Sequence, residues 1–69
     1  MRLIFLAEKE GELQPMMRFT GSFEKGCLRF NRLSGYEIFW VIVDDQPMQK
    51  AVPYGDAEWR LTDDSTPHI

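Results

Sequence analysis

Residues 21–35 have the sequence GSFEKGCLRFNRLSG, and the conformation of this stretch decides the fold of the whole chain. Apolar side chains recur in it at the spacing of an α-helix and would form one stripe. The stripe consists of Phe23, Cys27, Phe30 and Leu33. Ser22 stands where an N-cap would be, and Gly35 stands where a left-handed C-terminal residue would be. Gly26 argues against a helix, because glycine costs about 1 kcal/mol relative to alanine inside one.

The same stretch also fits a strand, since its second half alternates apolar and polar residues and Ser34-Gly35 would make a two-residue turn. Residues 38–43 decide between the two, because they form an unbroken apolar run of strand length. A strand sends alternate side chains to opposite faces, so both faces of this run need cover. A helix just before the run can cover one of them. We therefore predict a helix at about 22–34 with its apolar stripe facing inward.

The rest of the chain reads as short strands separated by turn-forming residues. Strands are predicted over residues 2–7, 13–20, 36–43, 48–52 and 57–61, with a single helical turn as the alternative for the last. The predicted fold class is α+β, with one helix packed on one face of a small antiparallel sheet of four to five strands. The order is strand, strand, helix, strand, strand, and the alternative is an all-β meander or small barrel. We expect one domain over 1–61 and a flexible acidic tail over 62–69.

The second face of the strand at 38–43 has no evident cover. One face carries Ile38, Trp40 and Ile42, and the other carries Phe39, Val41 and Val43. We expect that either residues 1–20 fold over the remaining face or another chain covers it. The second possibility predicts a symmetric homodimer, because twofold symmetry is the commonest closed arrangement.

The composition excludes several classes of protein. The chain has 69 residues, a net charge of −3 and one cysteine, so an internal disulfide cannot form. No His/Cys set has metal-ligand spacing, since His68 is the only histidine. No segment approaches transmembrane length, and a lone thiol fits a reducing cytosol. We therefore expect a cytoplasmic protein with no membrane partner, metal or cofactor.

The sequence gives little support for any catalytic group. Cys27 lies on the apolar stripe, where a thiol behaves as a small hydrophobe, and His68 is next to the last residue. Carboxylates in the turns at 44–45 and 56–58 would hold a cation or act as acid and base only if they met in a cleft. Asp is also common in turns, because its side chain bonds its own backbone. The sequence therefore predicts a non-catalytic protein.

Charge is unevenly distributed and predicts the binding surface. Residues 1–35 hold six cationic and four acidic side chains, whereas residues 36–69 hold two and seven. We expect the protein to regulate or inhibit a larger macromolecule with a basic surface, as a nucleic-acid mimic would, and such a protein suits a phage or mobile element. The predicted contact residues are Asp44, Asp45, Tyr54, Asp56, Glu58 and Trp59.

The alternative function uses the opposite charge. Lys25, Arg29 and Arg32 recur at helical spacing on the face opposite the apolar stripe. Three neighbouring cations repel one another slightly, and a polyanionic partner would relieve this repulsion. The alternative is therefore a nucleic-acid-binding protein that uses this basic helix face.

Overall fold

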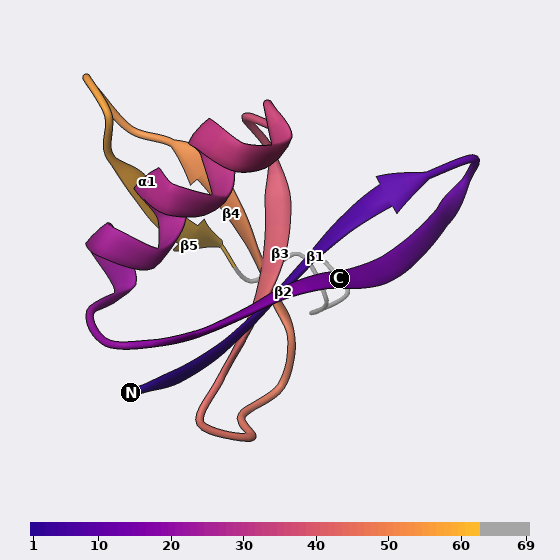
Figure 1. Cartoon of the computed structure of the whole chain (residues 1–69), viewed down its shortest axis with the longest axis horizontal. Helices are drawn as coiled ribbons and strands as arrows, with labels where there is room; N and C mark the ends of the chain where they lie inside the picture. Colours follow the sequence, from indigo (N-terminus) through magenta and orange to yellow (C-terminus); the bar gives the residue numbers. More distant parts are fainter. Residues whose placement is uncertain (63–69) are drawn as a thin grey trace, which may run out of the picture.

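The computed structural model describes residues 1–62, which form one helix and five strands in a single antiparallel sheet (Figure 1). The elements are β1 (Arg2–Lys9), β2 (Glu12–Thr20), α1 (Phe23–Ser34), β3 (Phe39–Val43), β4 (Gln49–Pro53) and β5 (Trp59–Thr62). The strand order is β2-β1-β3-β4-β5, and α1 lies across one face. The α+β prediction is confirmed, and the open sheet excludes the barrel alternative.

The local signals around α1 account for its bounds. The side chain of Ser22 accepts a hydrogen bond from the backbone N–H of Lys25 at 3.3 Å, which satisfies one orphan donor of the first turn. Gly35 adopts a left-handed φ of 81° and donates its N–H to the carbonyl of Asn31 at 2.8 Å. The helix prediction for 22–34 is confirmed, and the strand alternative for this stretch is wrong.

The inner face of α1 agrees with the predicted stripe except at its end. Cys27 and Phe30 are buried and Phe23 is partly buried, but Leu33 is 71% exposed. Each residue advances the helix by about 100°, so a stripe that starts at Phe23 has turned onto the flank of the helix by the last turn. The prediction that Leu33 faces inward is therefore wrong, and Gly26 lies on the inner face of α1 instead.

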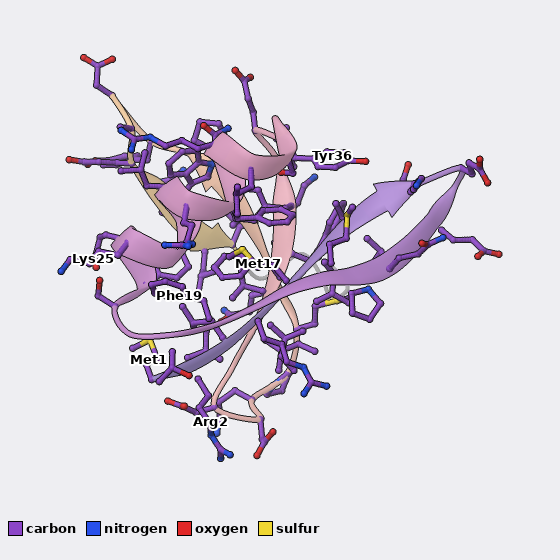
Figure 2. The ribbon with its side chains drawn as sticks, in the orientation of Figure 1. Met1, Arg2, Met17, Phe19, Lys25 and Tyr36 are labelled. Carbon is purple, nitrogen blue, oxygen red and sulfur yellow. The ribbon has the colours of Figure 1, made fainter. Side chains whose placement is uncertain are left out.

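The core fills the space between α1 and one face of the sheet. In the ladder, Leu3 lies opposite Phe19 and Val43, and Phe5 lies opposite Met17 and Val41; Figure 2 labels Phe19 and Met17. The Phe30 ring packs 5.3 Å from the Phe5 ring. The buried side chains are Leu3, Phe5, Ala7, Cys27, Phe30, Phe39, Val41 and Ala51. These contacts join the N-terminal hairpin, the helix and the later strands into one core.

The N-terminal hairpin widens the sheet and does not cover its second face. Strand β1 pairs with both β2 and β3, so residues 1–20 lie beside β3 in the same layer. The predicted division of β3 is confirmed: Phe39 and Val41 are buried under α1, and Trp40 and Ile42 alternate to the opposite side. The expectation that residues 1–20 fold over that side is wrong.

Each strand differs from its predicted bounds by one to three residues at one end or both. Strand β3 begins at Phe39 because residues 36–38 connect α1 to the sheet, and the last strand extends to Thr62. The helical-turn alternative for 57–61 is wrong, since Trp59 to Thr62 pair with β4. The remainder of the predicted tail, with His68, lies outside the described residues.

Candidate functional site

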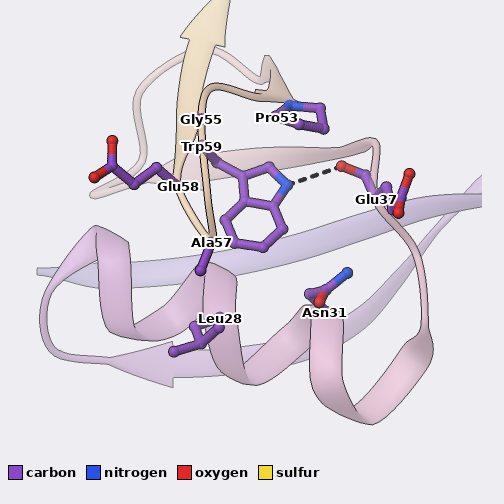
Figure 3. Close-up of a pocket in the computed structure, with 8 residues that line it drawn as sticks. All are labelled: Leu28, Asn31, Glu37, Pro53, Gly55, Ala57, Glu58 and Trp59. Carbon is purple, nitrogen blue, oxygen red and sulfur yellow. Dashed lines mark hydrogen bonds between the residues drawn. The ribbon is translucent and has the colours of Figure 1, made fainter.

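A groove of about 330 Å³ lies between α1 and the turn that joins β4 to β5 (Figure 3). Its volume is near the lower end of the range for ligand sites, and the groove is open to solvent. Two elements that are distant in the sequence form its walls, so it exists only in the folded chain. The groove is lined by Leu28, Asn31, Glu37, Pro53, Gly55, Ala57, Glu58 and Trp59.

Trp59 forms the aromatic surface of this groove and is held in place from two sides. Its indole Nε1–H donates to the backbone carbonyl of Glu37 at 2.8 Å (Figure 3). Its ring lies 5.8 Å from that of the buried Phe39. Two contacts therefore fix the orientation of the ring before any partner arrives, which lowers the entropy cost of binding.

Hydrogen bonds also fix the two segments that flank the indole. The amide Nδ2 of Asn31 donates to the carbonyl of Tyr36 at 2.8 Å and holds the connection after α1. The backbone N–H of Tyr54 donates to the carbonyl of Glu58 at 2.8 Å and closes the β4–β5 turn. Asn31 and Glu37 were not predicted as site residues, because their place in the groove depends on how the connection after α1 crosses the sheet.

The rim of the groove is acidic. Glu37 and Glu58 are both exposed lining residues, and Asp56 is an exposed residue of the same turn. Within residues 1–62, none of these three carboxylates forms an ion pair. An aromatic floor beside carboxylates suits a lysine or arginine side chain, which gains both a cation–π contact and charge-assisted hydrogen bonds.

Asp44 and Asp45 lie at the other end of the sheet. They occupy the β3–β4 turn, where their φ angles of 46° and 63° and a 2.8 Å hydrogen bond from Gln46 N–H to the Val43 carbonyl define a tight hairpin turn. The backbone N–H of Arg2 donates to Asp44 Oδ1 at 2.7 Å, and Arg2 Nη2 lies 3.7 Å from Asp45 Oδ2. These two carboxylates therefore stabilise the turn and the start of β1.

The predicted acidic patch is thus divided among three places. Glu58 and Trp59 line the groove and Asp56 lies in the same turn, whereas Asp44 and Asp45 lie at the opposite end of the sheet. The ring of Tyr54 lies 5.1 Å from the guanidinium of Arg60, whose strand position faces away from α1. The two acidic turns therefore do not meet in one cleft, because successive hairpin turns lie at opposite ends of the strand they share. Among residues 1–62, no three His, Cys, Asp or Glu side chains lie close enough together to hold a metal ion.

The basic helix face is assembled as predicted. Lys25, Arg29 and Arg32 are all exposed on the outer side of α1 and line a shallow hollow of about 300 Å³. Leu28 and Leu33 lie beside them in the same hollow. In the described part of the chain none of the three cations forms an ion pair, so this face keeps its full positive charge.

Cys27 is buried on the inner face of α1, and burial raises its pKa to about 12, with a smaller contribution from the negative charge of Glu24. The unfolded chain releases this proton near the ordinary value of 9.0. From about pH 9 to pH 12 the unfolded state therefore binds fewer protons, and stability falls as pH rises, by at most about 1.4 kcal/mol per pH unit.

We therefore expect the free energy of unfolding in urea to fall more steeply between about pH 8 and pH 10 for the native sequence than for Cys27→Ala. The variant controls for every other pH-dependent group of the chain. Equal slopes for the two proteins would contradict burial of the thiol.

Within residues 1–62, α1 is too short and too polar to cross a membrane. Comparison of the chain with protein-family models, with curated proteins and with solved structures finds no match.

Proposed function

We propose that the chain is a non-catalytic, cytoplasmic protein that regulates or inhibits a larger protein by accepting a basic segment of that partner in the groove between α1 and the β4–β5 turn. The observation that carries this proposal is the fixed indole of Trp59 between the exposed carboxylates of Glu37 and Glu58. The basic segment of the partner would ordinarily bind an acidic ligand. A segment that binds nucleic acid is one example.

The two kinds of groove residue have different roles in this proposal. The indole offers a large rigid surface, and aromatic residues of this kind are enriched among those that dominate interface energies and dissociation rates. The exposed carboxylates accelerate and orient the encounter with a basic surface, and salt weakens this effect. Asp44 and Asp45 stabilise the turn at the other end of β4, so the contact at the groove does not include them.

A charge reversal at the rim tests the groove. With a fluorescently labelled oligoarginine peptide as the probe, Glu58→Lys should weaken binding about tenfold, mainly through slower association, and should flatten its salt dependence. Fluorescence anisotropy and stopped-flow mixing measure both effects.

The matched control is Glu12→Lys, which makes the same change in net charge on the exposed N-terminal hairpin. It should change the affinity less than about twofold, since screening limits the reach of a surface charge to about 10 Å. An equal loss in both variants would show that the peptide responds to net charge alone, and the groove would not be the site.

A second candidate function is binding of a polyanion such as duplex DNA by Lys25, Arg29 and Arg32. The observation that favours it is the absence of any ion pair to these three exposed cations within residues 1–62. In gel-shift assays at low salt, Arg29→Glu combined with Arg32→Glu should abolish duplex binding and leave peptide binding in the groove intact.

A further inference from the structure

The sheet face opposite α1 has an apolar centre that no described element covers. Ile4 lies opposite Ile42 in the ladder, and Leu6 lies opposite Trp40, so these four side chains share one face. Val52 alternates to the same side of β4, next to the buried Ala51. All five are only partly buried within residues 1–62.

Cations surround this apolar centre. Arg18 lies opposite Ile4, Arg60 lies opposite Val52, and Lys50 lies opposite Trp40 with its Nζ 5.6 Å from the centre of the indole ring. Arg2 alternates to the same face at the end of β1. Among the strand residues of the described chain, the only carboxylate that alternates to this face is Glu8, in the distant half of the N-terminal hairpin.

Two aromatic rings are part of the same surface. Trp40 lies at its centre, and Tyr54, which is 58% exposed, lies beside Arg60 at its edge. Two shallow hollows of about 250 and 240 Å³ lie on either side of Ile4 and Arg18 at the other edge. Cations therefore stand at both edges of the sheet, with apolar and aromatic groups between them.

We infer that this open sheet face binds single-stranded nucleic acid, with bases stacked on Trp40 and Tyr54 and phosphates held by Arg18, Lys50 and Arg60. Proteins that bind single strands combine cations that follow the backbone with aromatic rings on which bases stack. Five strands at about 4.8 Å spacing give a surface about 19 Å across, which a short oligonucleotide spans. A chain with a net charge of −3 thus has a sheet face of the opposite sign.

Charge also argues against a second copy of the chain as the occupant. A symmetric dimer through this face would bring its cations against the same cations of the other copy, and like charges across an interface cost several kcal/mol. A polyanion removes this repulsion and covers the apolar centre at the same time. The homodimer predicted from the sequence therefore becomes the competing outcome of the test.

The test is fluorescence anisotropy with a short labelled oligothymidylate at low salt. Arg18→Glu and Arg60→Glu should each weaken binding about tenfold, and affinity should fall steeply as salt rises. Trp40→Leu keeps an apolar residue in the strand, removes the stacking surface and should also weaken binding about tenfold. Circular dichroism and urea unfolding check that each variant folds.

The matched control is Lys9→Glu, which makes the same charge change at the far end of β1, where alternation places Lys9 on the α1 side of the sheet, and it should alter oligothymidylate binding less than about twofold. An equal loss in this variant would overturn the assignment to the sheet face. Dimers in sedimentation, abolished by Trp40→Leu and with no oligothymidylate bound, would make a second copy the occupant. Glu58→Lys should leave oligothymidylate binding unweakened, so this inference and the groove proposal fail independently.

Discussion

Replacing Phe30 with alanine should destabilise the fold by about 3–5 kcal/mol, as large truncations in a core do. Phe30 is 2% exposed and its ring packs 5.3 Å from that of Phe5 and 5.0 Å from that of Phe39. It therefore joins α1 to the neighbouring strands β1 and β3. A chain of this size has a total stability of about 3–10 kcal/mol, so the variant should be largely unfolded or close to it. Urea unfolding followed by circular dichroism measures the loss.

Leu33→Ala is the matched control on the same helix. Leu33 is 71% exposed, and its removal should change stability by less than about 0.5 kcal/mol. The sequence alone predicts similar losses at both positions, because it places both on the apolar stripe. Similar losses in the two variants would support the predicted stripe and contradict the orientation of α1 in the structure.

Local signals in the sequence are sufficient to predict the helix and the fold class. Ser22 and Gly35 fitted a helix with both of its caps, the same stretch also fitted a strand, and the apolar run at 38–43 decided between the two; the structure confirms the helix and its caps. The strand order is not predictable in the same way. The placement of β1 between β2 and β3 depends on long-range pairing that leaves no mark in a local pattern.

The candidate site was only partly predictable for a related reason. Glu58 and Trp59 were predicted as contact residues, and they lie in the groove. Leu28 and Asn31 complete it from α1, and only tertiary packing brings the helix to the β4–β5 turn. The position of Asp44 and Asp45 at the other end of the sheet, in contrast, follows from hairpin geometry. It could have been predicted from the order of the strands along the chain.

Charge summed over the sequence was a poor guide to charge on surfaces. The acidic second half supplies Lys50 and Arg60 to the open sheet face, while the carboxylates that it contributes to residues 36–62 lie in the connection after α1 and in the turns at the two ends of the sheet. Alternation along a strand separates residues that are adjacent in sequence, so a surface can differ in sign from the segment that supplies it. The same alternation places Tyr54 next to Arg60 and away from Trp59.

Gly26 gives the sharpest contrast between local propensity and packing. Helix propensity alone predicts that Gly26→Ala stabilises α1 by about 1 kcal/mol. In the structure, a Cβ at this position would lie 2.9 Å from Leu3 Cδ1, 2.9 Å from Phe5 Cζ and 3.0 Å from Phe19 Cδ2. Phe5 is fully buried and cannot move without disturbing the rest of the core. The glycine therefore lets α1 approach the sheet closely.

We expect Gly26→Ala to destabilise the protein by about 2 kcal/mol, because overpacking of a core costs about 1–3 kcal/mol or more and exceeds the gain in propensity. The change in the urea midpoint at constant slope measures the loss. Combining it with Leu3→Val, which removes the Cδ1 atom nearest the new methyl group, should cost less than the sum of the single changes. A stabilising effect of Gly26→Ala alone would mean that α1 lies farther from β1 than the structure places it. The close packing of the helix on the sheet would then be contradicted.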